Sequence, residues 1–250
     1  MDRAALQRRL SWLFGEVVEV IDETARVRTL VMEVSGWPGH MAGQHVDVRL
    51  TAADGYQAQR SYSISSAPDD PRLALTIERL DDGEVSAYLV DELRVGDRLE
   101  LRGPIGGYFV WDVSAGGPLL LVAGGSGICP LMAILRHRSA VGSAVPTRLI
   151  YSSRSLDEVI YRAELDRIAA AGNGLTVLHT LTRSQPSGWS GYGRRIDTKM
   201  LADAAWTPAD TPLTYVCGPT ALVETVADSL VNLGHDASRI KTERFGPTGG

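Results

Sequence analysis

The pattern of apolar and polar positions changes character about halfway along the chain. In the first half, short β-rich or alternating runs are separated by Gly, Pro and Asp turn signals, a spacing typical of a β sandwich or barrel. One helix is expected to interrupt them, over Gly83–Leu93. The expected strands are Glu16–Ile21, Val27–Val34, His45–Leu50, Ser61–Ser65, Leu73–Ile77 and Arg98–Arg102.

The second half follows a Ser/Gly-containing linker within Asp112–Gly117. Pro118–Ala123 is a continuous apolar run, as expected of a strand that is buried on both faces. Strands and helices then alternate, which predicts a parallel sheet with helices on both faces. The other expected strands are Thr147–Tyr151, Leu175–Thr180 and Leu213–Cys217, and the expected helices are Pro130–Arg138, Glu158–Ala171, Thr198–Ala205 and Pro219–Leu233.

Composition narrows the class of protein. The chain has 250 residues, 44% of them hydrophobic, which fits one large domain or two of ordinary size. Its net charge of -5 argues against nucleic-acid binding. No apolar run reaches the ~20 residues that span a bilayer, and the charged N-terminal segment lacks the apolar core of a signal peptide. We therefore expect no membrane span and a cytoplasmic location.

Metal chemistry is not expected from this sequence. The two cysteines, Cys129 and Cys217, cannot supply the four usual ligands of an iron–sulfur cluster. The five histidines show neither i, i+4 pairing nor a Cys/His cluster, so each is expected to be a surface or structural residue. We expect no bound metal.

A glycine-rich segment, Gly124–Gly127, lies between the apolar strand and the next helix. Glycines allow the backbone to approach a pyrophosphate closely, and the N-terminus of a helix presents free N–H groups to an anion. Pro130 suits the first turn of that helix, where its missing N–H is no loss. The alternative is a tight turn without a ligand, since the segment departs from the usual dinucleotide fingerprint.

A second segment with candidate ligand-binding side chains, Arg60–Ser66, lies on an expected strand of the first half. Alternation along a strand places Arg60, Tyr62 and Ile64 on one face. Arg60 can bind a phosphate in a bidentate manner, Tyr62 can flank an aromatic ring, and Ser63 can hydrogen-bond to a ring edge. Without further context, such residues more often belong to an ordinary exposed edge strand.

Together with three other segments, these two resemble the ferredoxin–NADP reductase family, in particular the reductase modules of oxygenase systems. The resemblance covers nearly the whole chain, and the segments follow one another in the order of the family. They are Arg60–Ser66, Gly103–Gly106, Ala123–Pro130, Cys217–Pro219 and Glu243–Phe245.

The resemblance implies a two-domain fold. Residues 1–113 would form an antiparallel, six-stranded, Greek-key FAD-binding β-barrel with a short N-terminal helix. Residues 114–250 would form a Rossmann-like parallel α/β domain that binds NAD(P)H.

The resemblance also implies an FAD site on the barrel. Arg60 would meet the FAD pyrophosphate, Tyr62 would pack against the isoalloxazine ring, and Ser63 would approach N5. At the chain end, either Phe245 stacks on the flavin or the tail from Gly246 lies along its adenine half. The expected FAD-binding residues are Arg60, Ser61, Tyr62, Ser63, Thr76, Ile77, Glu78, Gly83, Glu84, Val85, Ser86, Phe245 and Gly246.

By the same resemblance, Ser63, Cys217 and Glu243 are the expected catalytic residues. Cys217 would lie beside the nicotinamide C4, although most free cysteines are simply small buried apolar residues. Glu243 would approach the nicotinamide and couple it to proton supply, and its alternative is an exposed glutamate near the chain end.

The expected dinucleotide site favours NADPH, with NADH possible. Thr182 and Arg183 follow a strand where NADPH-using relatives place a hydroxyl residue and an arginine, and no acidic residue is present there to bind a ribose diol. NADH-using relatives carry similar pairs. The expected NAD(P)H-binding residues are Gly125, Ser126, Gly127, Ser152, Arg154, Thr182, Arg183, Cys217, Gly218 and Pro219.

The expected function is that of an FAD-dependent NAD(P)H oxidoreductase. Hydride would pass from the nicotinamide to FAD, and electrons would then pass to a separate redox protein such as a ferredoxin or an oxygenase component. We expect a monomer. Two alternatives stay open: a flavin or small-molecule reductase, and a non-catalytic flavoprotein subunit of a larger complex.

Overall fold

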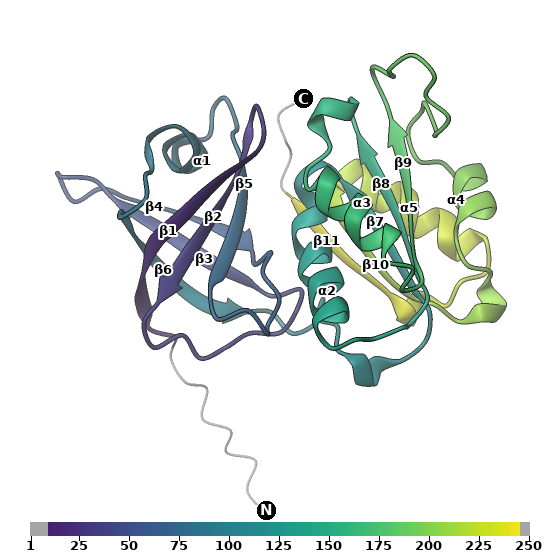
Figure 1. Cartoon of the computed structure of the whole chain (residues 1–250), viewed down its shortest axis with the longest axis horizontal. Coiled ribbons are helices and arrows are strands. Elements are labelled where there is room, and N and C mark those ends of the chain that lie inside the picture. The colour runs from purple at the N-terminus through teal and green to yellow at the C-terminus, as the bar shows by residue number, and fades with distance from the viewer. Residues whose placement is uncertain (1–9, 246–250) are drawn as a thin grey trace, which may run out of the picture.

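The computed structural model of the chain describes residues 10–245. A β barrel and an α/β unit lie side by side, with the barrel formed by the first half of the chain (Figure 1). The expected N-terminal helix and Gly246 fall outside the described residues. Within the described part, no helix is long and apolar enough to cross a membrane.

The barrel is a six-stranded antiparallel sheet in the order β4-β3-β6-β1-β2-β5. Its two outer strands meet at the antiparallel bridge between Ile64 and Leu75, which closes the sheet on itself. The inward positions of the alternating runs form one core that includes Val17, Leu30 and Val48. The strands are β1 (Trp12–Thr24), β2 (Val27–Val34), β3 (His45–Thr51), β4 (Gln57–Ser63), β5 (Leu73–Glu78) and β6 (Arg98–Ile105).

A short helical segment covers one end of the barrel. It begins as α1 (Glu84–Ala87) and continues as a π-helical turn over Tyr88–Glu92, close to the expected Gly83–Leu93. Val85 and Leu89 pack into the barrel core. The segment thereby fixes the Gly83 turn at the barrel end.

The second unit is a five-stranded parallel sheet in the order β11-β10-β7-β8-β9. Alternation along the fully buried β7 explains its two-sided core: Leu119 and Leu121 pack in one apolar cluster, whereas Leu120 and Val122 pack in another. Helices α2 and α3 cover the first face, and α4 and α5 the second (Figure 1). The elements are β7 (Leu119–Gly124), α2 (Ile128–Ala140), β8 (Thr147–Ser153), α3 (Arg162–Ala170), β9 (Leu175–Leu181), α4 (Thr198–Ala204), β10 (Leu213–Pro219), α5 (Thr220–Asn232) and β11 (Ile240–Phe245).

Several elements differ from the sequence-based expectation. Strand β1 is longer than the expected Glu16–Ile21, and β4 begins and ends before the expected Ser61–Ser65. The helix expected from Glu158 begins only at Arg162, because Tyr161 adopts a left-handed backbone conformation with φ of 59°. Strand β11 was not expected from the pattern, yet it pairs in parallel with β10. Strand β11 forms an edge of the sheet. Its pairing with β10 places Glu243 and Phe245 beside the end of that strand.

The buried hydroxyl of Thr76 joins the two units. Its Oγ1 lies 2.7 Å from Oγ1 of Thr29 and 3.2 Å from Oγ of Ser65, within the barrel. From the α/β unit, the hydroxyl of Tyr161 donates to the same oxygen. Since Tyr161 is buried, this contact lies inside the interface between the two units.

Charged side chains of α2 support the same interface. Arg136 donates to the carbonyl oxygen of Ser65 at 2.7 Å and is held by Glu164 at 2.6 Å. His137 lies 2.6 Å from the carboxylate of Asp69. The relative placement of the two units therefore rests on several independent contacts.

Candidate functional site

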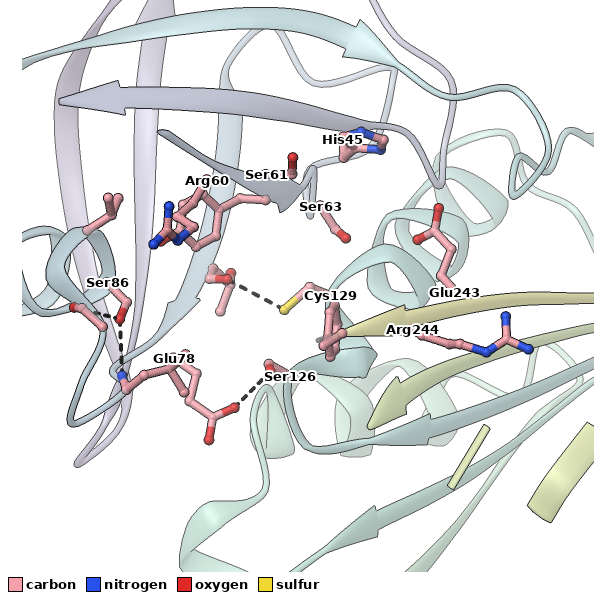
Figure 2. A pocket seen from close by; sticks show the side chains of 16 residues that line it. His45, Arg60, Ser61, Ser63, Glu78, Ser86, Ser126, Cys129, Glu243 and Arg244 are labelled. Carbon is pink, nitrogen blue, oxygen red and sulfur yellow. Dashed lines mark hydrogen bonds between the residues drawn. The ribbon is translucent and has the colours of Figure 1, made fainter. Parts of the chain in front are cut away.

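A cavity of about 530 Å³ lies between the barrel and the carboxyl edge of the parallel sheet (Figure 2). In open α/β folds, ligands bind at this edge of the sheet. We call this cavity the interdomain cavity. Its lining combines residues of β4, β5 and the α1 turn with residues of the glycine-rich loop and β11: His45, Arg60, Ser61, Tyr62, Ser63, Thr76, Glu78, Leu80, Gly83, Val85, Ser86, Ser126, Cys129, Glu243, Arg244 and Phe245.

Strand β4 forms the barrel wall of the cavity. Arg60 is exposed, and its guanidinium donates to the neighbouring carbonyl oxygen of Gln59 at 2.7 Å. Among residues 10–245, no carboxylate pairs with Arg60. Burial of the Tyr62 phenol raises its pKa to about 12, so this ring is a neutral, mainly apolar surface. An uncompensated cation beside an apolar surface suits a ligand with an anionic group and a flat ring.

Ser61 and Ser63 differ in how they are held. The Ser61 hydroxyl donates to Asp47 at 2.7 Å, and Arg102 binds the other oxygen of that carboxylate, also at 2.7 Å. Ser63 pairs with His45 between β4 and β3, and both residues line the cavity. Ser61 therefore acts as a fixed part of the wall, whereas Ser63 faces the space between the two units (Figure 2).

The Gly83 turn is fixed from within. The Ser86 hydroxyl donates to the carbonyl oxygen of Gly83 at 3.2 Å and accepts from the Leu80 amide at 3.1 Å. A Cβ at position 83 would lie 2.3 Å from that hydroxyl oxygen, so a larger residue would displace the Ser86 hydroxyl from the turn. With its proton used inside the turn, the Ser86 hydroxyl has none left for a phosphate in this arrangement. Of the expected residues nearby, Ile77 and Glu84 do not line the cavity.

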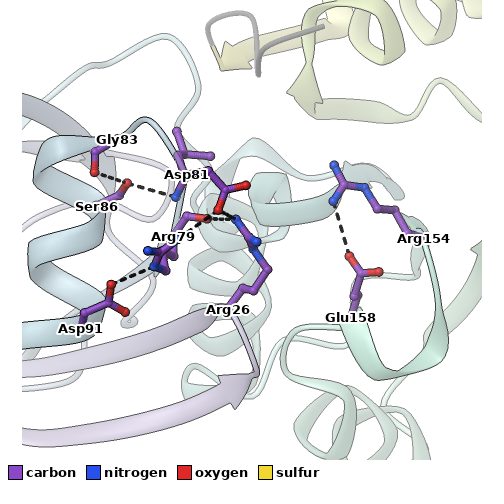
Figure 3. A network of polar contacts seen from close by, with 9 residues as sticks. Arg26, Arg79, Asp81, Gly83, Ser86, Asp91, Arg154 and Glu158 are labelled. Atoms are coloured by element: carbon purple, nitrogen blue, oxygen red, sulfur yellow. Dashed lines mark hydrogen bonds and ion pairs between the residues drawn. The ribbon is translucent and has the colours of Figure 1, made fainter.

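A network of ion pairs supports this turn from outside (Figure 3). Asp81 accepts from Arg26 at 2.8 Å and from Arg79 at 3.0 Å, and Arg79 also binds Asp91 at 2.8 Å. Exposed pairs stabilise a fold only weakly, about 0–1 kcal/mol each. Their effect here is to fix the direction of the chain between β5 and α1.

The glycine-rich loop closes the opposite wall of the cavity. It forms a single helical turn over Gly125–Gly127, between β7 and α2. A Cβ at Gly127 would lie 2.1 Å from the carbonyl oxygen of Cys217, so the close approach of the loop to β10 requires glycine. Ser126 lines the cavity and donates to Glu78 of the barrel at 2.7 Å. Gly125, Gly127, Gly218 and Pro219 lie outside the lining.

The two cysteines occupy different positions. Cys217 is fully buried in the apolar core, and it pairs with Glu243 in the register of β10 and β11. Burial and the nearby Glu243 carboxylate raise its pKa well above the usual range. Cys129 lines the cavity and donates to the carbonyl oxygen of Thr76 at 3.7 Å. Burial raises the pKa of Cys129 to about 12, so both are neutral thiols at physiological pH.

Glu243 has the cavity's most perturbed carboxylate. Burial raises its pKa to about 7, so the side chain exchanges a proton near neutral pH. Its neighbour Arg244 lines the cavity and pairs with Glu224 at 2.6 Å. Phe245 lies at the end of the same strand and also lines the cavity. A carboxyl group with this pKa can accept or donate a proton without a metal or a second base.

The expected adenosine-binding residues gather beyond the cavity, at the ends of β8 and β9. The amide of Thr182 donates to the carbonyl oxygen of Ser153, and that of Arg183 to the carbonyl oxygen of Arg154, both at 2.9 Å. Arg183 is exposed, and no carboxylate in the described part of the chain pairs with it. Arg154 is loosely paired with Glu158 at 3.7 Å (Figure 3). Ser152 is buried at the end of β8.

Sequence reasoning missed four residues that line the cavity: His45, Leu80, Cys129 and Arg244. Cys129 carried a signal, because it stands in the first turn of the helix after the glycine-rich loop. His45 carried none beyond its place in the strand that pairs with β4.

Both halves of the chain match known protein domains. Residues 16–110 match the model of the oxidoreductase FAD-binding domain, and residues 121–228 that of the oxidoreductase NAD-binding domain. Ferredoxin–NADP reductase B of Sorangium cellulosum is 34% identical over 212 residues, which cover 82% of this chain and 84% of that protein. The chain belongs to the ferredoxin–NADP reductase family. The two domains of this family are an FAD-binding and a NAD-binding domain, as the sequence predicted.

Another relative matches over part of its length. The glycine betaine monooxygenase reductase subunit of Pseudomonas aeruginosa is 34% identical over 237 residues, which cover 92% of this chain and 63% of that subunit. The chain thus spans about 63% of the length of this relative.

Solved structures confirm the two-domain fold. The FAD/NAD-binding domain of a nitric oxide dioxygenase from Vibrio cholerae superposes with a TM-score of 0.83 at 25% identity, over 94% of this chain and 99% of that one. A cytochrome P450 reductase from Amycolatopsis gives a TM-score of 0.83 at 26% identity, over 96% of this chain and 71% of that one.

Proposed function

We propose that the chain is an FAD-dependent NAD(P)H oxidoreductase that delivers electrons to a separate redox protein. One observation carries this proposal most directly. The unpaired guanidinium of Arg60 and the apolar face of Tyr62 lie on one wall of a cavity whose other wall is the glycine-rich loop. A flavin with a pyrophosphate fits the first wall, and a nicotinamide dinucleotide fits the second.

FAD, once bound, supplies the hydride-accepting chemistry, and the protein positions the reacting groups. We propose that Arg60 binds the FAD pyrophosphate together with backbone amides of the Gly83 turn. Tyr62 supports the flat ring, and Ser63 presents its hydroxyl toward the gap between the domains. The other FAD-site predictions from the sequence keep the same status as proposals.

On the dinucleotide side, the protein provides an anion-binding turn and a proton donor. Ser126 and the loop amides bind the pyrophosphate, while Thr182 and Arg183 receive the adenosine ribose and its phosphate. Glu243 holds or releases a proton near neutral pH beside the reacting rings. Cys217 supports this edge from behind, since its side chain is buried in the core.

Two further proposals concern the electron acceptor and the preference of the chain for NADPH over NADH. Several relatives are reductase subunits or components of oxygenase systems, which favours a protein acceptor of that kind. The exposed, unpaired Arg183 favours NADPH over NADH. We place the domain boundary between residues 113 and 114, in the segment that joins β6 and β7. A monomeric state and a cytoplasmic location stay predictions.

Anaerobic reduction of the FAD-loaded protein tests the proposal. We expect NADPH to bleach the flavin absorbance in a stopped-flow experiment, with a lower half-saturating concentration than NADH. The reduced protein should then pass electrons to a ferredoxin faster than to free flavin. A flavin that neither dinucleotide reduces would contradict the assigned activity, and turnover with free flavin alone would contradict the protein acceptor.

A further inference from the structure

The Glu78 carboxylate lies at an unusual place for an acidic group. It stands at the end of β5 and projects from the barrel toward the glycine-rich loop (Figure 2). One of its oxygens accepts from the Ser126 hydroxyl at 2.7 Å, and the same oxygen lies 3.9 Å from a Cβ built on Gly125. Among residues 10–245, no Lys, Arg or His side chain pairs with Glu78. A bare carboxylate thus covers the loop that is suited to bind an anion.

Other contacts also hold the two domains together. The Thr76–Tyr161 hydrogen bond and the contacts of Arg136 and His137 join them elsewhere. Interdomain docking therefore does not depend on this carboxylate alone. The Glu78 carboxylate instead lies where it contacts any ligand that approaches the Ser126 hydroxyl.

A hydroxyl has a single proton to donate. While Ser126 donates to Glu78, it cannot donate to a phosphate oxygen, and the carboxylate also repels an anion that approaches the loop. We propose that the Glu78 carboxylate competes with the dinucleotide pyrophosphate for the Ser126 hydroxyl, and thereby weakens dinucleotide binding and promotes product release. The inference rests on the proposed function, because it takes the glycine-rich loop to be the pyrophosphate site. Any contact of the Glu78 backbone with FAD is compatible with it.

Equilibrium binding to the FAD-loaded protein tests the competition. Calorimetric titration with NADP⁺ and with ADP-ribose compares the wild type with Glu78→Gln and Glu78→Ala; ADP-ribose keeps the pyrophosphate but lacks the nicotinamide. Removal of one unpaired charge near an anion should lower both Kd values by roughly fivefold or more. Asp82→Asn is the matched control, since it removes the same charge from an exposed position in the adjoining turn and should leave both Kd values unchanged.

Three results would overturn the proposal. Kd values that stay the same in both Glu78→Gln, which removes the charge, and Glu78→Ala, which also removes the acceptor, would show that the carboxylate does not compete. Higher values would show that it binds a ribose hydroxyl instead. Loss of FAD from Glu78→Gln would show that the side chain serves the flavin. If the Kd values fall as expected while the wild-type flavin is not reduced by NADPH or NADH, the competition stands and the proposed activity fails.

Discussion

The barrel wall of the interdomain cavity and the expected dinucleotide edge, which extends beyond the cavity to the ends of β8 and β9, are built differently. On the barrel wall, the serine hydroxyls are engaged by their own domain: Ser61 with Asp47, and Ser86 within the Gly83 turn. Arg60 is the exception, since it is exposed and pairs with no carboxylate among residues 10–245. At the dinucleotide edge, the side chains that would contact the ligand are freer, as in the exposed Arg183 and the loosely paired Arg154. A preorganised wall loses little conformational entropy when a ligand binds, whereas exposed side chains must be ordered by each ligand.

This difference matches two kinds of cofactor use. A preorganised site suits a cofactor that stays bound through many turnovers. A site with exposed arginines and a competing carboxylate suits a dinucleotide that must leave after each reaction. The predictions below test whether barrel-wall changes affect FAD retention while dinucleotide-edge changes affect exchange and rate.

The largest effect is expected for Arg60→Ala. Loss of an unpaired cation that binds a pyrophosphate should cost about 2–3 kcal/mol, which corresponds to roughly 100-fold weaker FAD binding. Flavin content after gel filtration and a fluorescence titration with FAD measure the loss. Arg98→Ala is the control, because Arg98 is an exposed barrel arginine paired with Glu16 at 3.1 Å. Equal FAD affinity in the two variants would remove Arg60 from the site.

The second prediction concerns the pH dependence of stability that the raised pKa of Glu243 causes. Since burial raises its folded pKa to about 7 from a usual 4.5, the folded state prefers the protonated form. The stability that it contributes is complete below pH 4.5 and is lost as pH rises through about 7. Relative to Glu243→Gln, the wild type should lose on the order of 2–3 kcal/mol of unfolding free energy between pH 4.5 and 8. Urea unfolding at both pH values measures it, and a constant difference would show that Glu243 titrates normally.

The two cysteines offer an internal comparison at the dinucleotide edge. Cys217→Ala should slow flavin reduction about tenfold while FAD stays bound, because a small displacement behind the edge misplaces the nicotinamide. Cys129→Ala, on the cavity wall, should slow it less. Stopped-flow measurement of the flavin reduction rate in both variants shows which cysteine matters more. A wild-type rate in Cys217→Ala would favour the simpler role of a buried apolar residue.

The smallest effect is expected for Arg183→Ala. An exposed arginine that meets a phosphate contributes about 1 kcal/mol, so the KM for NADPH should rise about fivefold while the KM for NADH stays nearly constant. Arg167→Ala removes an exposed arginine of α3 that is loosely paired with Glu164, and it should change neither value. A parallel rise for both dinucleotides in Arg183→Ala would end the assignment of Arg183 to the 2′-phosphate.

Hydrophobic patterning predicted most of the fold because most elements bury a regular face. The β7 run and the six barrel strands follow this rule. Strand β11 escaped prediction because an edge strand tolerates charge, and Ile240–Phe245 mixes Lys, Glu and Arg with apolar residues. The start of α3 was wrong because Tyr161, buried in the domain interface, takes a backbone conformation that propensity disfavours.

The candidate site was predictable where a motif supplied the chemistry. Arg60, Tyr62 and Ser126 came from such motifs, and the structure brings them to one cavity. The sequence could not show that the Ser86 hydroxyl donates its proton to the Gly83 carbonyl oxygen within its own turn. It also gave no sign of the contact between Glu78 and Ser126, because that contact depends on how two separately folded units meet.

The Thr76 hydroxyl has a consequence for how the molecule unfolds. It contacts Thr29 and Ser65 inside the barrel and Tyr161 from the α/β unit, so loosening either unit breaks hydrogen bonds that belong to both. Buried bonds that are shared in this way couple the unfolding of one unit to that of the other. The chain should therefore give a single calorimetric peak, and heat damage to the α/β unit should also release FAD from the barrel.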